Sequence, residues 1–303
     1  MKNSKIKMTQ EVTKNVNLDE FTNLKMYDCN DMIEVTGSRN HNSPWSYIKR
    51  YDENHYIYLS TGELRKYNRG KKRSYNKNNL QKTFKKLKRI ISANFMGNPN
   101  ERHLVLKYKE TMFNSENLYS DYKSFWEKLK RQYPNHEYLR IAEPHKNGSW
   151  HLHILIKDTV NEKFSIPNEK LVEFWGKGEV YDSPIYNAKA IRFYFYPSSK
   201  KSSTPGMQEK ARRLKFYPKD LNIYTKSKGI ITPKGEKKIP NEIREATKCH
   251  DLTFSVISNI TSVNPDGEEV LVNKILNQQY DRNSNSVNQI SKPELSENGK
   301  EGC

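Results

Sequence analysis

Residues 150–156, Trp-His-Leu-His-Ile-Leu-Ile, constrain the fold more than any other stretch, because they combine a continuous apolar run with two histidines. Side chains on a β-strand alternate between its two faces. His151 and His153 therefore point to one face, while the apolar residues at even positions point to the other. We predict a buried strand that carries two imidazoles on a single face.

Two imidazoles on one face of a strand can hold one metal ion. Neutral imidazole is the commonest protein metal ligand, and the Cβ atoms of such a pair lie roughly 6 to 7 Å apart. The alternative is a pair of half-buried histidines that only form hydrogen bonds. The spacing of His151 and His153 by itself leaves both interpretations open.

A second strand is predicted directly before the histidine strand, at Tyr138–Glu143. Asn147 and Gly148 are typical turn residues, so the two strands should form an antiparallel hairpin. If the pairing centres on Asn147, Glu143 lies opposite His151 on the same face, with Cβ atoms roughly 5 Å apart. A shift of one residue would turn the carboxylate away, so this third ligand depends on the register.

The charge of the chain indicates a polyanionic partner. The 303 residues include 53 Lys and Arg against 35 Asp and Glu, which gives a formal net charge of +18, and 19 tyrosines. This balance is typical of nucleic-acid binding, and aromatic rings among cations suit unstacked bases. The alternative is a basic protein that is merely soluble.

Other classes of protein are disfavoured. The three cysteines, Cys29, Cys249 and Cys303, are odd in number and far apart, which argues against a disulfide framework or a cysteine-based zinc site. No stretch reaches the ~18 apolar residues that a membrane span needs. We therefore expect a cytoplasmic protein without a membrane segment.

A cationic amphipathic helix is predicted at 80–95, where apolar residues recur at helical spacing until Gly97 and Pro99 end the pattern. Its other face is basic, with Lys82, Lys85, Lys86, Lys88 and Arg89. Such a face is often only solvated, and it could also suit a membrane surface. The net charge of the chain favours contact with DNA.

The remaining pattern predicts an alternation of strands and helices. Strands are expected at 32–36, 56–59, 103–108, 180–181, 213–217, 222–225, 251–257 and 269–272, and helices at 118–133, 167–175 and from 187 until Pro197 breaks the segment. The strands at 251–257 and 269–272 are expected to form a hairpin. Most of residues 1–43, and the basic stretch 200–213, are interpreted as arm or loop.

These residues suggest phosphodiester chemistry. Two imidazoles and one carboxylate leave open positions on a divalent ion, where a phosphate oxygen can bind. A tyrosine hydroxyl nearby could attack the phosphorus and give a protein-bound phosphotyrosine and a free 3′-hydroxyl. A phenol has a pKa of about 10, so it needs activation by the metal or by a cation such as Lys200.

Several stretches share their order and spacing with a known family. Residues 138–143 (Tyr-Leu-Arg-Ile-Ala-Glu) followed by 148–156 (Gly-Ser-Trp-His-Leu-His-Ile-Leu-Ile) match its metal-binding motif. Residues 103–108 look like its first strand motif, although the threonines usual there are absent. Together with 80–95, 211–218 and 227–230, they resemble the rolling-circle replication initiators of the HUH endonuclease superfamily, especially those of small plasmids and filamentous phages.

The resemblance implies an α+β fold, with a central antiparallel sheet of about five strands flanked by helices and the histidines on a central strand. It covers about residues 75–235, which we interpret as an HUH endonuclease-like catalytic domain. Residues 1–74 would be a partly flexible N-terminal arm and hairpin, residues 236–277 a C-terminal hairpin extension, and residues 278–303 a disordered tail.

The activity implied by the resemblance is metal-dependent nicking and rejoining of single-stranded DNA at a replication origin. Glu143, His151 and His153 would hold Mg²⁺ or Mn²⁺. Single-stranded origin DNA, with a hairpin or duplex flank, would be the substrate, and a host helicase and polymerase are expected as further partners. Phosphate contacts are expected from Lys82, Lys85, Lys86, Lys88, Arg89, Arg212 and Arg213.

The family nucleophile maps onto Tyr194 or Tyr196, with Lys200 as the accompanying cation. The usual helix carries a tyrosine followed by a lysine, whereas Pro197 interrupts the segment here. Tyr194 lies in the helical part and ranks first. Tyr196 has the better spacing to Lys200 but lies directly before Pro197.

Two rival functions use the same residues differently. One is a zinc-dependent hydrolase in which the three ligands activate water, without a covalent step. The other is a basic nucleic-acid-binding protein without catalysis, whose histidines are structural.

Overall fold

The computed structural model describes residues 7–40, 48–58, 62–67, 77–197, 204–263 and 267–282. The chain divides into two compact units. We call residues 70–232 the central unit, and residues 1–69 together with 233–303 the flanking unit. Each is described by itself.

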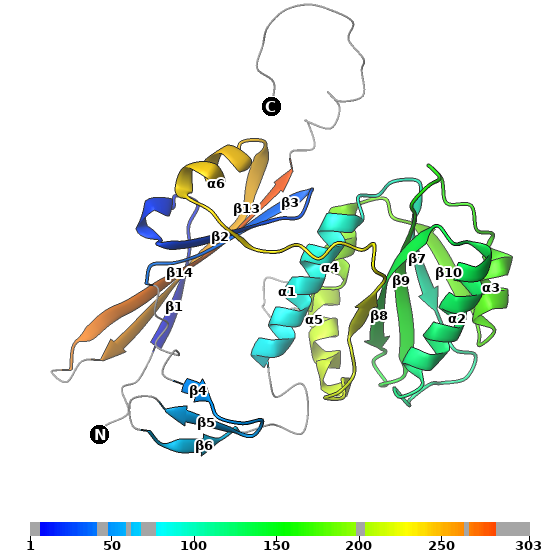
Figure 1. Ribbon diagram of the computed structural model, residues 1–303, viewed down its shortest axis with the longest axis horizontal. Coiled ribbons are helices and arrows are strands. Elements are labelled where there is room, and N and C mark those ends of the chain that lie inside the picture. The colour runs from blue at the N-terminus through cyan, green and yellow to red at the C-terminus, as the bar shows by residue number, and fades with distance from the viewer. Residues whose placement is uncertain are drawn as a thin grey trace, which may run out of the picture. The chain divides into compact units, whose positions relative to one another are not determined.

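The central unit contains a five-stranded antiparallel sheet, in the order β10-β7-β9-β8-β11 (Figure 1). Its strands are β7 (Glu101–Leu106), β8 (His136–Pro144), β9 (Trp150–Asp158), β10 (Val180–Pro184) and β11 (Tyr224–Lys226). The predicted α+β fold, with an antiparallel sheet of about five strands and the histidines on a central strand, is confirmed.

Helices cover both faces of this sheet (Figure 1). They are α1 (Lys77–Asn94), α2 (Leu118–Gln132), α3 (Asn168–Trp175), α4 (Ala188–Tyr194) and α5 (Pro205–Arg213), followed by a 3-10 turn at Leu214–Phe216. On one face, Trp126 of α2 packs on Tyr138 of β8, with ring centres 4.4 Å apart. On the other, Phe195 after α4 packs on His153, with ring centres 5.1 Å apart. Every residue of β9 except Lys157 is therefore buried.

The turn between β8 and β9 sets their register. The Asn147 side chain accepts hydrogen bonds from the amide and hydroxyl of Ser149, and Gly148 adopts a φ of 89° beside the ring of Phe216. A positive φ is readily adopted only by glycine. The resulting pairs include Glu143 opposite His151, so the condition for a third ligand is met.

The flanking unit contains a six-stranded antiparallel sheet, in the order β1-β13-β14-β3-β2-β12. Its strands are β1 (Lys7–Val12), β2 (Asn23–Asp28), β3 (Met32–Ser38), β12 (Glu236–Lys237), β13 (His250–Val263) and β14 (Glu269–Arg282). A short 3-10 turn at Leu18–Glu20 and α6 (Pro240–Ala246) pack on it around Leu24, Val35 and Leu276. A separate sheet joins β4 (Ile48–Arg50), β5 (His55–Tyr58) and β6 (Leu64–Lys66).

Several sequence interpretations of the connecting segments are wrong. Residues 1–43 are not mostly arm, because β1 and β2 pair there with β13 and β3. Residues 205–213 form α5 rather than a loop, since Thr204 caps the first turn by accepting the amide of Met207, with Pro205 following. Residues 213–217 are the end of α5 and a 3-10 turn rather than a strand.

At the C-terminus, the expected hairpin is present and longer than predicted, as β13 and β14. Residues 278–282 belong to β14 rather than to a tail, and residues 283–303 lie outside the described part of the chain. None of the described helices combines the length and apolar character that crossing a membrane requires.

The central strand makes a direct prediction about stability. Ile154 is fully buried in β9, so Ile154→Ala should lower the free energy of unfolding by about 2 to 5 kcal/mol through lost burial and the cavity left behind. Val160→Ala, at a side chain that is 69% exposed, is the control and should change it by less than about 0.5 kcal/mol. Urea denaturation followed by tryptophan fluorescence measures this, because Trp126, Trp150 and Trp175 all lie in the central unit. Equal effects would contradict the place of Ile154 in the core.

Candidate metal centre

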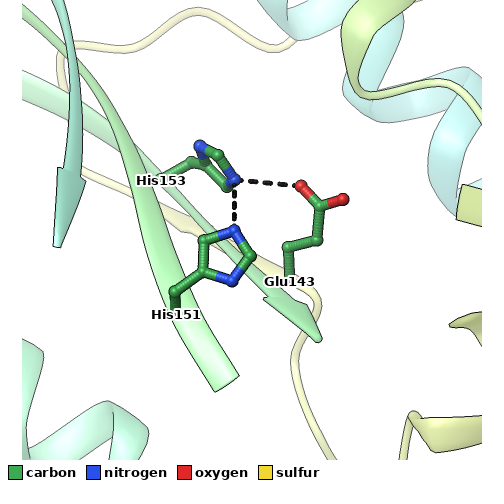
Figure 2. Close-up of side chains that lie close together, drawn as sticks. All are labelled: Glu143, His151 and His153. Carbon is green, nitrogen blue, oxygen red and sulfur yellow. Dashed lines mark hydrogen bonds and ion pairs between the residues drawn. The ribbon is translucent and has the colours of Figure 1, made fainter. Parts of the chain in front are cut away.

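Three buried side chains meet where β8 ends and β9 begins. Figure 2 shows Glu143, His151 and His153 turned toward one another. The Nε2 atom of His153 lies 2.9 Å from Oε2 of Glu143 and 2.8 Å from Nε2 of His151. One ligand atom from each residue lies within 4.8 Å of the others, so the group could hold a metal ion.

The hydrogen bonding of this group fits a divalent ion. Two neutral imidazole nitrogens that face each other can share only one proton, which leaves lone pairs directed into the same space. Oε2 of Glu143 is buried and, among the described residues, makes no hydrogen bond of normal geometry despite its closeness to His153. Two imidazoles and a carboxylate are a donor set that divalent metals commonly use.

Burial keeps the two histidines neutral. Burial and the neighbouring rings of His153 and His145 lower the pKa of His151 to about 2. Burial also lowers the pKa of His153, although Glu143 acts in the opposite direction. Because a metal binds the neutral form of imidazole, both rings are ready to bind without first losing a proton at neutral pH.

Helix α5 supplies two cations to Glu143. The ammonium of Lys210 donates to Oε1 of Glu143, and Nη1 of Arg213 lies 3.3 Å from the same oxygen. The two cations are three residues apart, so they lie on the same side of the helix. Burial raises the pKa of Glu143, but the contacts with His153 and Lys210 outweigh burial and hold the pKa well below its ordinary value.

A third histidine, which the sequence analysis did not single out, touches this group. Nε2 of His103 in β7 lies 2.9 Å from Nδ1 of His153, and the two rings stack with centres 5.1 Å apart. Burial, followed by repulsion from His153, lowers the pKa of His103 to about 3. The only signal in the sequence was its position in the first strand motif.

The structure brings one of the two tyrosines to the centre. The ring of Tyr194, at the end of α4, lies 5.6 Å from that of His153, and the Lys210 ammonium lies 3.9 Å from the Tyr194 ring centre. The Tyr194 side chain is 45% exposed, so a substrate can reach it. Burial, reinforced by the charge of Glu143, raises the pKa of Tyr194 to about 12. Tyr196 instead packs, half-buried, against the apolar core, with the Lys88 ammonium 6.0 Å from its ring centre.

The predicted cations are distributed unevenly. Lys200 lies outside the described residues, and Lys210, which sequence reasoning missed, occupies the centre. Arg213 contacts Glu143, whereas the Arg212 side chain is 77% exposed beside Glu209. On α1, Lys82 and Lys86 are exposed, and Lys85, Lys88 and Arg89 are half-buried.

Two hollows lie on the side of the sheet that carries the ligands. A small cavity of about 20 Å³ borders Glu143, Phe195, Lys210 and Arg213. A larger groove of about 390 Å³ runs between α1 and the start of β11, and its lining comprises Lys82, Thr83, Lys86, Asn222, Ile223 and Tyr224. The cross-strand partners Ile141 and Tyr224 border the cavity and the groove respectively, so the two hollows are close neighbours.

Comparison with known families adds independent information. Residues 101–201 match the family model of the replication-associated protein ORF2. This segment, about a third of the chain, contains Glu143, His151, His153 and Tyr194, and the match confirms the resemblance to rolling-circle replication initiators. No curated protein and no solved structure matches the chain.

The three ligands predict how the protein binds Mn²⁺. Titration calorimetry should detect one Mn²⁺ per chain, and His151→Ala should weaken the affinity about tenfold or more because one of three protein ligands is lost. His55→Ala, at a histidine of the flanking unit paired with Asp52, controls for the loss of an imidazole and should bind like the native protein. Equal affinity of His151→Ala and the native protein would exclude the centre.

Proposed function

We propose that this protein initiates rolling-circle replication by nicking single-stranded DNA at an origin and later rejoining it through a phosphotyrosine. The observation that carries the proposal is the closeness of Tyr194 to the Glu143, His151 and His153 group, within a segment matched by a replication-associated family. The proposed catalytic domain is residues 75–235. Single-stranded origin DNA with a hairpin or duplex flank is the proposed substrate, and a host helicase and polymerase are proposed partners.

Glu143, His151 and His153 would hold Mg²⁺ or Mn²⁺. When bound, such an ion would neutralise charge on the scissile phosphate. The Tyr194 hydroxyl loses its proton and attacks phosphorus, so that a tyrosine–phosphorus bond forms and the bond to the 3′-oxygen breaks. The departing 3′-oxygen takes up a proton, and the 5′-phosphate stays on the protein. Attack by a 3′-hydroxyl reverses the step and rejoins the strand.

Lys210 is the better supported cation for this step. Its ammonium contacts the Tyr194 ring and the Glu143 carboxylate at the same time. A positive charge beside a phenol favours the phenolate, which opposes the effect of burial on the Tyr194 pKa. The assignment of Lys200 remains a proposal for a residue outside the described part of the chain.

The groove between α1 and β11 suits the strand that enters the site. Lys82 and Lys86 stand one turn apart on its α1 side, and the Tyr224 ring lies on the other side. Lysines bind phosphate in any sequence, and a tyrosine ring can stack on a base. The groove borders the cavity beside Glu143, so one strand could contact both.

The central test is a covalent adduct. The native protein incubated with single-stranded origin DNA and Mn²⁺ should form a protein–DNA adduct that mass mapping assigns to Tyr194. Tyr194→Phe should abolish the adduct because the nucleophilic oxygen is removed, whereas the matched variant Tyr196→Phe should retain it. An adduct that survives Tyr194→Phe but not Tyr196→Phe would overturn the choice of tyrosine.

The same assay separates the rival functions. A zinc-dependent hydrolase would bind zinc tightly and cleave without an adduct. A binding protein without catalysis would hold DNA in a salt-sensitive way that a chelator does not change. Either result would overturn the proposed nickase.

The groove makes a prediction about salt dependence. Replacing two phosphate contacts, as Lys82→Gln with Lys86→Gln, should reduce the slope of log affinity for single-stranded DNA against log salt by about 1.4, at ~0.7 per contact. Lys123→Gln with Lys170→Gln removes the same charge from α2 and α3, which pack on the opposite face of the sheet, and serves as the control. Fluorescence anisotropy at several salt concentrations measures both slopes. Equal slopes for the two pairs would exclude this groove.

A further inference from the structure

His103 lies beside the metal centre without being one of its three ligands. Its Nε2 atom is 2.9 Å from Nδ1 of His153, on the side of that ring away from Glu143 and His151. The His153 residue is 1% exposed, so water has little access to Nδ1. The contact with His103 is therefore the hydrogen bond that the structure provides for this nitrogen.

Backbone pairing puts the two histidines within reach. Val105 of β7 pairs with His153 of β9, so His103 is a diagonal neighbour of His153 on the same face of the sheet. The rings of Tyr194 and Phe195 pack edge-on against His103, with centres 5.9 and 5.8 Å away. The sheet and these rings hold the His103 imidazole in place.

We propose that His103 is a positioning residue that selects the tautomer of His153 and so determines which of its nitrogens faces the metal. The inference rests on the metal-binding part of the proposed function, and it requires neither nicking nor a tyrosine adduct.

The argument depends on a single proton. A neutral imidazole carries one N–H, and a metal needs the lone pair of the other nitrogen. His153 presents Nε2 to Glu143, so its proton must be on Nδ1 when Nε2 acts as a ligand. His103 accepts this Nδ1–H through its own Nε2.

Without an acceptor at position 103, the preference of His153 reverses. A buried N–H that loses its partner is costly, and Glu143 is a strong acceptor on the other side of the ring. The proton then moves to Nε2 and donates to Glu143. The lone pair that the metal needs is lost, and His153 and Glu143 are tied to each other instead.

The test compares two replacements of His103. In His103→Phe a ring remains, but the acceptor is removed. In His103→Gln the side-chain oxygen can reach the position of Nε2 and accept the same hydrogen bond. We expect the Phe variant to bind Mn²⁺ about 10 to 100-fold more weakly than the native protein, and the Gln variant to recover most of this loss. Titration calorimetry measures the affinities, and His55→Phe controls for the removal of a histidine from the flanking unit.

A second readout does not depend on metal. Nitrogen-15 NMR of the imidazoles, without metal, should show His153 protonated at Nδ1 in the native protein and in His103→Gln, and at Nε2 in His103→Phe. Native Mn²⁺ affinity in His103→Phe, or an Nε2-protonated His153 in the native protein, would overturn the proposal. If His103→Phe does not fold, the native spectrum and the Gln variant decide it.

The outcome is separable from that of the proposed function. A native protein that binds Mn²⁺ through a correctly protonated His153, but forms no DNA adduct, would overturn the nickase and leave the role of His103 intact. Adduct formation that persists with a native Mn²⁺ affinity in His103→Phe would do the reverse.

Discussion

The pairing of β8 with β9 is the constraint on which the candidate centre depends. Glu143 lies opposite His151 only because the turn at 145–149 sets that register. In an antiparallel pair, a slip of one residue moves every side chain of a strand to the other face. The carboxylate would then point toward α2 and away from the imidazoles. A short polar turn thus decides whether this chain has a metal centre.

The second requirement is charge balance around a buried carboxylate. A carboxylate that is 5% exposed is costly unless cations or hydrogen bonds compensate for lost water. Lys210 and Arg213 provide this compensation from α5, an element far along the chain from the hairpin. Lys210 also touches Tyr194, so one cation links the ligand group to the tyrosine beside it. The centre is therefore assembled from the sheet and from helices laid over one of its faces.

The hairpin, α1 and the order of the sheet could be predicted because they follow strong local patterns, such as the apolar run around His151 and His153 and the helical spacing from Leu80 to Phe95. The strand β1 could not, because all its side chains are exposed and it is held by backbone pairing with β13. His103 was invisible for a different reason, since contact between β7 and β9 depends on a pairing that no local pattern reveals. The start of α5 was readable, because Thr204 and Pro205 are ordinary helix-start residues whose signal was outweighed by the basic composition around them.

Gly148 shows how closely the two halves of the centre are coupled. A Cβ atom at this position would lie 3.0 Å from the ring of Phe216, in the 3-10 turn that follows α5. Any side chain there would press on the end of the helix that carries Arg213. A residue that shapes the turn of the hairpin thus also sets how near the compensating cations can come. Ligand geometry and local charge can therefore be lost together through a change at a position that touches neither the ligands nor the cations.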